Sequence, residues 1–159
     1  MGTVLTWINW AERTQSDLTV WGFVASAKYL DDEQVYGAGM RLVESEGDID
    51  AEIEQVIRQF GSLKEAEVSR LGWLVVRKAR DKRGIIELWC EEIGRCRNED
   101  LILVGLPTIG RVGVGSPIVL STLRKCRGSS NGAIAAVATE IASTLSGKSG
   151  DVKSGDGRK

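Results

Sequence analysis

The chain has 159 residues, of which 42% are hydrophobic and 27% charged, and its formal net charge is −1 at pH 7. This length predicts one domain with a hydrophobic core of its own. No apolar run approaches the ~18 residues of a membrane-spanning helix, and no secretory signal is recognisable, so we expect a soluble, cytoplasmic protein without a transmembrane segment.

Histidine is absent, and the chain has three cysteines. Without histidine, the most common general base and the usual activation of a serine or cysteine nucleophile are missing. Three cysteines cannot make a four-cysteine zinc site, so we expect Cys90, Cys96 and Cys126 to be free thiols. We therefore predict that the protein is not an enzyme and has no metal site and no cofactor.

Helices are predicted at both ends of the chain and in its middle. Residues 3–13 fit a short helix, with a strand as the alternative, and residues 48–60 place five apolar side chains on one helical face. The sequence Ser62–Glu65 has the form of a capping box that opens a second, shorter helix towards Arg70. Asn131 is the predicted N-cap of a final helix that ends at Gly147.

Strands are predicted where β-branched and aromatic residues gather between charged or glycine-containing turns. These segments are residues 18–27, 34–43, 73–79, 85–93, 101–106 and 118–123. The predicted fold class is α+β: an antiparallel sheet of about five to six strands, with the N-terminal, central and C-terminal helices packed on it. An exposed edge of such a sheet would allow a homodimer to form by strand addition.

Two further segments connect or follow these elements. Residues 107–116 are rich in glycine but lack the lysine of a phosphate-binding loop, so we interpret them as a connection between strands. Residues 147–159 contain the sequence KSGD twice and one apolar side chain. We therefore predict a globular domain over residues 1–146 and a disordered tail over residues 147–159.

Charge is distributed unevenly along the chain. Residues 1–69 hold 13 acidic and 5 basic side chains, a net of −8, whereas residues 70–159 hold 9 acidic and 16 basic side chains, a net of +7. The densest basic segment is the predicted hairpin tip, with Arg77, Lys78, Arg80, Lys82 and Arg83. A basic β-ribbon of this kind can bind RNA or another polyanion by neutralising its phosphates, although basic tips also serve solubility alone.

Aromatic residues are concentrated in the first part of the chain. Trp7 and Trp10 stand three residues apart, so a helix places both on one side. Together with Trp21 and Tyr36 they are predicted to line an aromatic groove of the kind that binds proline-rich segments in the polyproline II conformation. The alternative is that these side chains close the edge of the core.

Three motifs resemble the pattern of profilin: W-x-x-W-A-E at Trp7–Glu12, D-x-x-V-Y at Asp32–Tyr36 and I-x-x-V-I-R-x-F at Ile53–Phe60. The resemblance covers residues 1–60 and the final helix, and roadblock-type adaptor domains share much of the same element order. It implies binding to actin monomers and to proline-rich peptides, with Trp7 and Trp10 in the peptide site.

We therefore predict a non-catalytic α+β module with an adaptor or regulatory role, which binds a protein or peptide, a proline-rich segment in particular, through its aromatic surface. The alternative is an RNA- or polyanion-binding factor, viral or regulatory, that acts through the basic hairpin of residues 77–83.

Overall fold

The computed structural model describes residues 20–25, 32–45 and 47–157, and these residues form helices without a single strand. The predicted α+β fold with its antiparallel sheet is therefore wrong. The elements are α2 (Val20–Ala25), α3 (Asp32–Glu44), α4 (Asp50–Ile57), the short 3₁₀ helix η2 (Phe60–Ser62), α5 (Glu65–Lys78), α6 (Lys82–Arg95), α7 (Glu99–Val112), α8 (Pro117–Arg127) and α9 (Gly132–Gly157).

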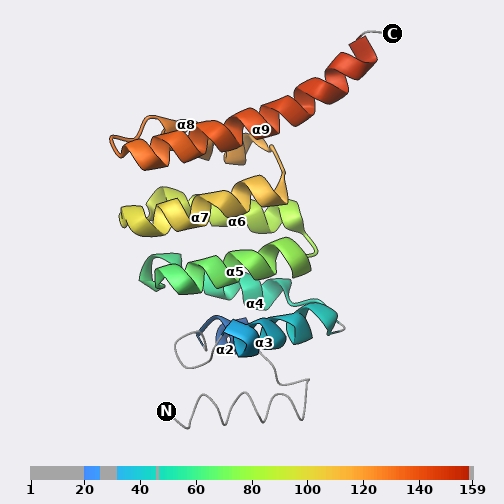
Figure 1. Ribbon diagram of the computed structural model, residues 1–159, viewed down its shortest axis with the longest axis vertical. Coiled ribbons are helices and arrows are strands. Elements are labelled where there is room, and N and C mark those ends of the chain that lie inside the picture. Colours follow the sequence, from blue (N-terminus) through green and yellow to red (C-terminus); the bar gives the residue numbers. More distant parts are fainter. Residues whose placement is uncertain (1–19, 26–31, 46, 158–159) are drawn as a thin grey trace.

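The helices pair into hairpins that are stacked on one another (Figure 1). The pairs in the described part of the chain are α2–α3, α4–α5, α6–α7 and α8–α9. One layer contains α3, α5, α7 and α9, and the other contains α2, α4, α6 and α8, with each helix packed against the next one in its layer. Such a stack, in which each hairpin packs on its neighbours, has the architecture of an α-solenoid.

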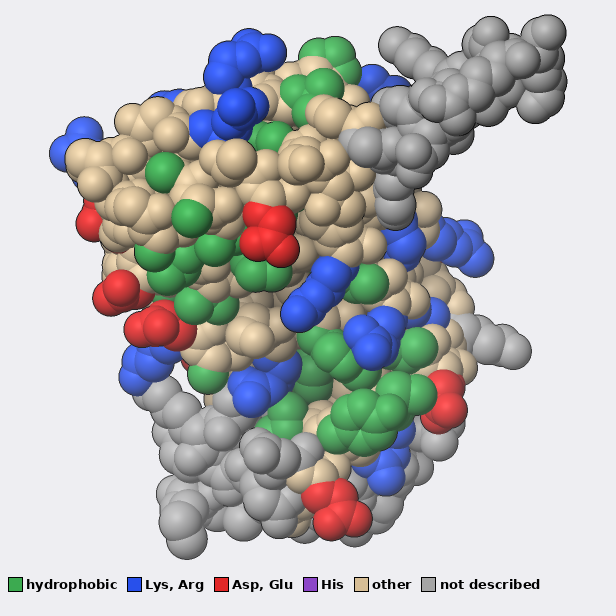
Figure 2. Space-filling model, turned by 45° about the horizontal axis from the view of Figure 1, so that its top comes forward, with side chains coloured by type: hydrophobic (Ala, Val, Ile, Leu, Met, Phe, Trp, Pro, Cys, Tyr) green, Lys and Arg blue, Asp and Glu red, His purple; other side chains and the backbone are tan. Residues whose placement is uncertain are grey.

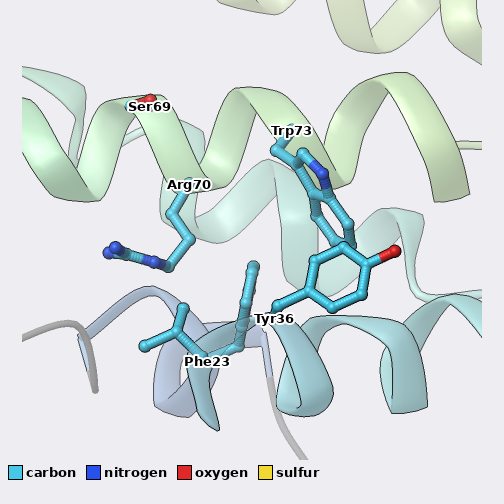
Figure 3. A pocket seen from close by; sticks show the side chains of 6 residues that line it. Phe23, Tyr36, Ser69, Arg70 and Trp73 are labelled. Atoms are coloured by element: carbon cyan, nitrogen blue, oxygen red, sulfur yellow. The ribbon is translucent and has the colours of Figure 1, made fainter. Parts of the chain in front are cut away.

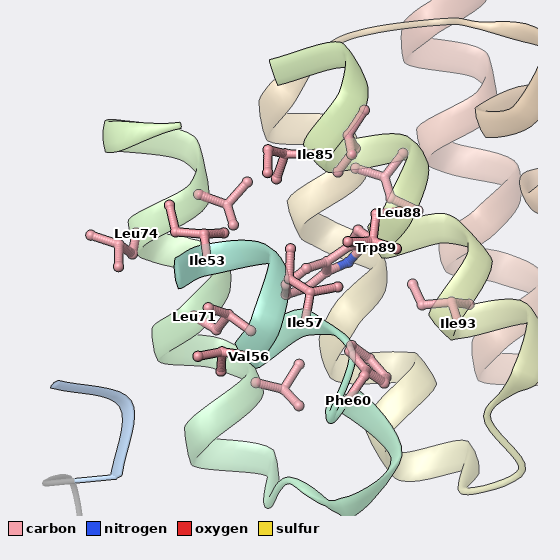
Figure 4. Close-up of a cluster of buried hydrophobic side chains, with 14 of the residues drawn as sticks. Ile53, Val56, Ile57, Phe60, Leu71, Leu74, Ile85, Leu88, Trp89 and Ile93 are labelled. Atoms are coloured by element: carbon pink, nitrogen blue, oxygen red, sulfur yellow. The ribbon is translucent and has the colours of Figure 1, made fainter. Parts of the chain in front are cut away.

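A sequence repeat of 33 residues underlies the stack. In the first helix of each hairpin, the equivalent core residues are Val20, Ile53, Ile86 and Val119, followed four residues later by Val24, Ile57, Cys90 and Leu123, all 0% exposed. In the second helix of each hairpin, the residues at the same interval of 33 are also buried: Val35, Val68, Leu101 and Ile134. Each hairpin thus adds equivalent apolar side chains to one continuous core, part of which is drawn in Figure 4.

Polar residues that predicted turns between strands are in fact helix N-caps. The Asp81 carboxylate accepts a hydrogen bond from the Gly84 amide (3.0 Å), and the Asn98 side chain accepts one from Asp100 (3.0 Å). The Ser116 hydroxyl accepts one from Val119 (3.4 Å), and Pro117 occupies the first turn of α8, where proline is favoured. These caps open α6, α7 and α8 where strands were predicted.

Each of the six predicted strands lies within a helix or overlaps one, for a common physical reason. Residues 18–27 and 34–43 overlap α2 and α3, and the other four segments belong to α5, α6, α7 and α8. The buried residues of these helices recur three and four apart, as Val68, Leu71 and Val75 do in α5, but the segments are rich in β-branched and aromatic residues, which strands also favour. The continuous apolar run of residues 101–106 therefore predicts a buried strand as readily as it predicts a buried helix.

Two of the predicted helices are confirmed, the central one and the final one. The predicted helix of residues 48–60 is shorter in the structure, where α4 spans Asp50–Ile57 and Phe60 opens η2. The Asn131 side chain accepts hydrogen bonds from the amides of Ala133 (3.0 Å) and Ile134 (3.2 Å) at the start of α9. The predicted capping box at Ser62 is wrong, because α5 begins at Glu65 and it is Glu67 that accepts a hydrogen bond from the Lys64 amide (2.8 Å).

Other boundaries also differ from the predicted ones. Helix α5 continues to Lys78 rather than ending near Arg70, and residues 107–112 of the predicted glycine-rich loop belong to α7. Helix α9 runs to Gly157, past the predicted end at Gly147, and projects beyond the stack (Figure 1). The division into a domain over residues 1–146 and a disordered tail stays a prediction.

The resemblance to profilin does not extend to the fold, because the described residues offer no sheet. For the same reason they provide no sheet edge for dimerisation by strand addition. The predicted helix of residues 3–13, with Trp7 and Trp10, lies outside the described residues. Within the described ranges, no helix is both long and apolar enough to cross a bilayer.

Candidate functional site

A pocket of about 200 Å³ opens where the first two hairpins meet (Figure 3). Helix α2 contributes Phe23, α3 contributes Val35 and Tyr36, and α5 contributes Ser69, Arg70 and Trp73. Phe23 and Val35 are buried and form the inner wall, whereas Trp73 is half-buried and the Tyr36 ring is 59% exposed. The pocket therefore has an apolar floor and an aromatic rim that solvent reaches.

Three aromatic rings make up one continuous wall of this pocket. The Trp73 ring lies 5.8 Å from the Phe23 ring and 5.9 Å from the Tyr36 ring, centroid to centroid, the latter in an edge-to-face arrangement. Gly39 makes this approach possible, because a Cβ atom there would lie 2.8 Å from atoms of both Phe23 and Trp73. The edge-to-face arrangement of the Tyr36 and Trp73 rings is one of the preferred geometries for aromatic pairs.

Two arginines give the aromatic wall a positive rim. The Arg77 guanidinium carbon lies 4.5 Å from the centroid of the Trp73 ring, within the range of a cation–π interaction. Arg70 lines the pocket and donates a hydrogen bond to the Ala66 carbonyl (3.4 Å). In the described part of the chain, no carboxylate lines this pocket. The site is thus aromatic, with two arginines beside it.

The predicted aromatic groove corresponds to this site only in part. Tyr36 lines the pocket, whereas Trp21 is 49% exposed on α2 but is not among the lining residues, and Trp7 and Trp10 lie outside the described residues. Sequence reasoning missed Phe23 and assigned Trp73 to a strand. The 33-residue repeat is the signal that would have placed Trp73 on the second helix of a hairpin, next to the helix that carries Tyr36.

The basic segment of residues 77–83 is not a β-hairpin tip but the connection between α5 and α6. Lys78 Nζ donates to the carbonyls of Ser45 (2.6 Å) and Val43 (3.4 Å), and Lys82 Nζ donates to the Ala79 carbonyl (2.8 Å). These lysines place positive charge at the C-terminal ends of α3 and α5, where the helix dipole favours it.

The remaining basic side chains of the segment do not form a continuous patch. Arg83 pairs with Glu87 (3.3 Å), Arg77 covers Trp73, and Arg80 is exposed. The Asp50 carboxylate accepts hydrogen bonds from the amides of Arg80 (2.9 Å) and Asp81 (2.8 Å), which places acidic groups beside the basic ones. Four of the five predicted polyanion-binding side chains therefore make contacts within the protein.

The basic residues at the end of α6 and in α8 are also separate from this segment. They are Arg95, Arg97, Arg124, Lys125 and Arg127. They lie at or just beyond the C-terminal ends of α6 and α8, one helix length, about 20 Å, from the α5–α6 connection. Binding of a polyanion through residues 77–83 stays a prediction, without a single basic face to support it.

A second pocket, of about 240 Å³, lies between α6, α7 and α8, and Cys96 and Cys126 line it. All three cysteines are free, and burial raises the pKa of the Cys90 thiol to about 12 and that of Cys126 above its ordinary value. A thiol that stays protonated is a poor nucleophile and a poor metal ligand. Among the described residues, no cluster of three or more potential metal ligands occurs.

We expect a thiol reagent at about pH 8 to modify Cys96 before Cys126, and Cys90 only after unfolding. Cys90 is fully buried, and its raised pKa keeps it protonated until the pH nears 12, so raising the pH to about 10 should leave it unmodified. Mass spectrometry of a labelling time course, with and without denaturant, measures each site. Labelling of Cys90 as fast as Cys96 in native buffer would contradict this burial.

Comparison of this chain with protein-family models, with curated proteins and with solved structures finds no match.

Proposed function

We propose that the chain is a non-catalytic interaction module that binds a peptide segment of a partner protein in the aromatic pocket between the first two hairpins. The observation that carries this proposal is the exposed Tyr36 ring set edge-on against the half-buried Trp73 ring, beside an open pocket. Proline rings of a polyproline II segment pack well between aromatic side chains, and this conformation loses little entropy on binding. A proline-rich segment is therefore the proposed ligand.

The size of the pocket and the shape of the stack both favour a peptide. Sites for small molecules and cofactors usually measure about 300–1,000 Å³, whereas about 200 Å³ accommodates one or two side chains. Helical repeats present an extended surface to their ligands. Half-buried apolar residues also occur on α7, at Ile102, Leu103 and Pro107. On the side of α3, α5, α7 and α9, Figure 2 shows hydrophobic side chains with basic side chains beside them.

Binding of RNA or another polyanion is the less favoured alternative. The contacts of Arg77, Lys78, Lys82 and Arg83 within the protein would have to be broken, or shared, to neutralise phosphates. The proposal of a peptide-binding module also includes a cytoplasmic location. Its partner is the protein that carries the bound segment.

Substituting Tyr36 tests the proposal with a matched control. We expect Tyr36→Ala to weaken binding of a proline-rich peptide about tenfold or more, because an aromatic wall of the pocket is lost. Trp21→Ala removes an aromatic side chain of similar exposure from the neighbouring α2, outside the pocket, and should leave the affinity unchanged. Isothermal titration calorimetry measures both variants. Absence of binding by the unmodified protein at millimolar peptide would overturn the proposal.

A further inference from the structure

We propose that two copies of the chain pair through the layer that contains α2, α4, α6 and α8, with α8 of each copy against α4 of the other. This inference is independent of the peptide site, because most of the residues that line that pocket belong to α3 and α5 in the other layer. Its basis is the charge of the helices in the α2–α8 layer and the exposed side chains that they carry.

Charge changes from negative to positive along the last three helices of this layer, which lie side by side in the order α4, α6, α8 (Figure 1). Helix α4 has three acidic side chains and no basic one, a net of −3. Helix α6 has three acidic and three basic side chains, and α8 has three basic side chains and no acidic one, a net of +3. A neutral helix therefore separates two helices of equal and opposite charge.

Two charged groups on each of the outer two helices are available to a partner. Glu52 on α4 and Arg124 and Arg127 on α8 are exposed, and Glu54 is half-buried. Among the described residues, none of these four side chains forms an ion pair, not even Glu54 with Arg58 at the end of its own helix, whereas α6 contains two ion pairs of its own. Since α5 covers α4, and α2 and α6 flank it, its exposed side chains face out of the layer.

A second copy of the chain is the partner that this pattern fits. A two-fold axis that runs along α6, at the surface of the layer, places α4 of one copy opposite α8 of the other, and α8 opposite α4. Each contact between opposite charges is then made twice, as in the isologous interface of a symmetric dimer. The neutral α6 meets its own equivalent, and like charges are kept apart, which favours this pairing over one of α8 with α8.

Exposed apolar side chains on α8 give the contact a hydrophobic part. Ile118 is 40% exposed and Leu120 is 36% exposed, and they are two of the four large hydrophobic side chains exposed in the described residues. The positions equivalent to Leu120 in α4 and α6 hold Glu54 and Glu87, so this position of the repeat is not apolar in general. Burial of Ile118 and Leu120 would add affinity to the specificity that the charges provide.

The test reverses the charges of one helix at a time in the full chain. We expect the unmodified protein to form a dimer with a micromolar Kd, which added salt weakens. Arg124→Glu with Arg127→Glu, and separately Glu52→Arg with Glu54→Arg, should each weaken dimerisation about a hundredfold, because like charges then meet. An equimolar mixture of the two double variants should restore the dimer, because α4 and α8 are complementary again. Sedimentation equilibrium measures the Kd.

Arg111→Glu is the control, because it reverses an exposed arginine on α7, in the other layer, and should leave the dimer unchanged. Circular dichroism confirms that each variant is folded. A protein that stays monomeric up to about 1 mM would overturn the dimer. If either double variant alone dimerised as tightly as the unmodified protein, or if their mixture stayed monomeric, the pairing of α4 with α8 would be wrong. All these outcomes leave the proposed peptide binding untouched.

Discussion

Replacing Trp89 by alanine is expected to lower the free energy of unfolding by about 3–5 kcal/mol, the largest effect of any single substitution considered for this protein. The Trp89 side chain is fully buried, and its ring packs edge-on against Phe60 with the centroids 5.4 Å apart. Its indole Nε1 also donates a hydrogen bond to the Gly105 carbonyl (2.9 Å). The substitution would therefore remove contacts between α6, η2 and α7 and leave a cavity among them.

Chemical denaturation followed by far-UV circular dichroism measures this loss. Trp89→Phe is the informative intermediate, because it keeps most of the apolar volume and loses the hydrogen bond to Gly105, worth about 1 kcal/mol. Trp21→Ala is the control, because that side chain is half exposed. If Trp89→Ala cost no more than Trp21→Ala, the placement of Trp89 in the core would be wrong.

Gly72→Ala is expected to destabilise the protein by about 2 kcal/mol, although alanine is ordinarily the better helix former by about 1 kcal/mol. A Cβ atom at Gly72 would overlap the Thr108 hydroxyl of α7. Helices α5 and α7 would have to separate to admit it, and the separation would loosen the contact between two adjacent hairpins.

A double-mutant cycle separates this steric cause from any other. Thr108→Ala removes the opposing hydroxyl, so Gly72→Ala should cost at least 1 kcal/mol less in that background than in the unmodified protein. Gly94→Ala in α6 is the matched control, because a Cβ atom there meets nothing within 4 Å, and it should stabilise the protein by about 0.5–1 kcal/mol. Equal effects at Gly72 and Gly94 would contradict the close approach of α5 to α7.

One repeat position holds glycine in three of the described hairpins and alanine in the last of them. Gly39, Gly72 and Gly105 are equivalent, and at each of them a Cβ atom would overlap a neighbouring side chain. In the fourth hairpin the equivalent residue is Ala138, on α9.

The sequence predicts helices correctly in α4 and at the start of α9. It fails for α2, α3 and most of α5 to α8, because these segments are rich in β-branched and aromatic residues, which favour strands and hide the helical spacing of the buried positions. The repeat was present in the residue types, as Val20, Ile53, Ile86 and Val119 show, but equivalent positions share apolar character rather than identity. A window of ten to twenty residues cannot detect an interval of 33 residues.

The candidate site could be predicted only as separate parts. Tyr36 was predicted to bind a peptide and Arg77 to bind a polyanion, at two different sites on two different elements. The structure brings them to the same aromatic residue, because Trp73 contacts the Tyr36 ring from one hairpin and the Arg77 guanidinium from its own helix. This juxtaposition depends on how the first hairpin stacks on the second, which no local pattern in the sequence specifies.

The stacking of equivalent hairpins also has a kinetic consequence. Since each hairpin packs chiefly on its neighbours, the chain closes only short loops, about one repeat long, as it folds. Folding then starts at any adjacent pair of hairpins and spreads in both directions, at a rate set by local contacts rather than by the meeting of distant segments. A chain first interpreted as a sheet of non-local strands thus belongs among proteins of low contact order, which fold quickly.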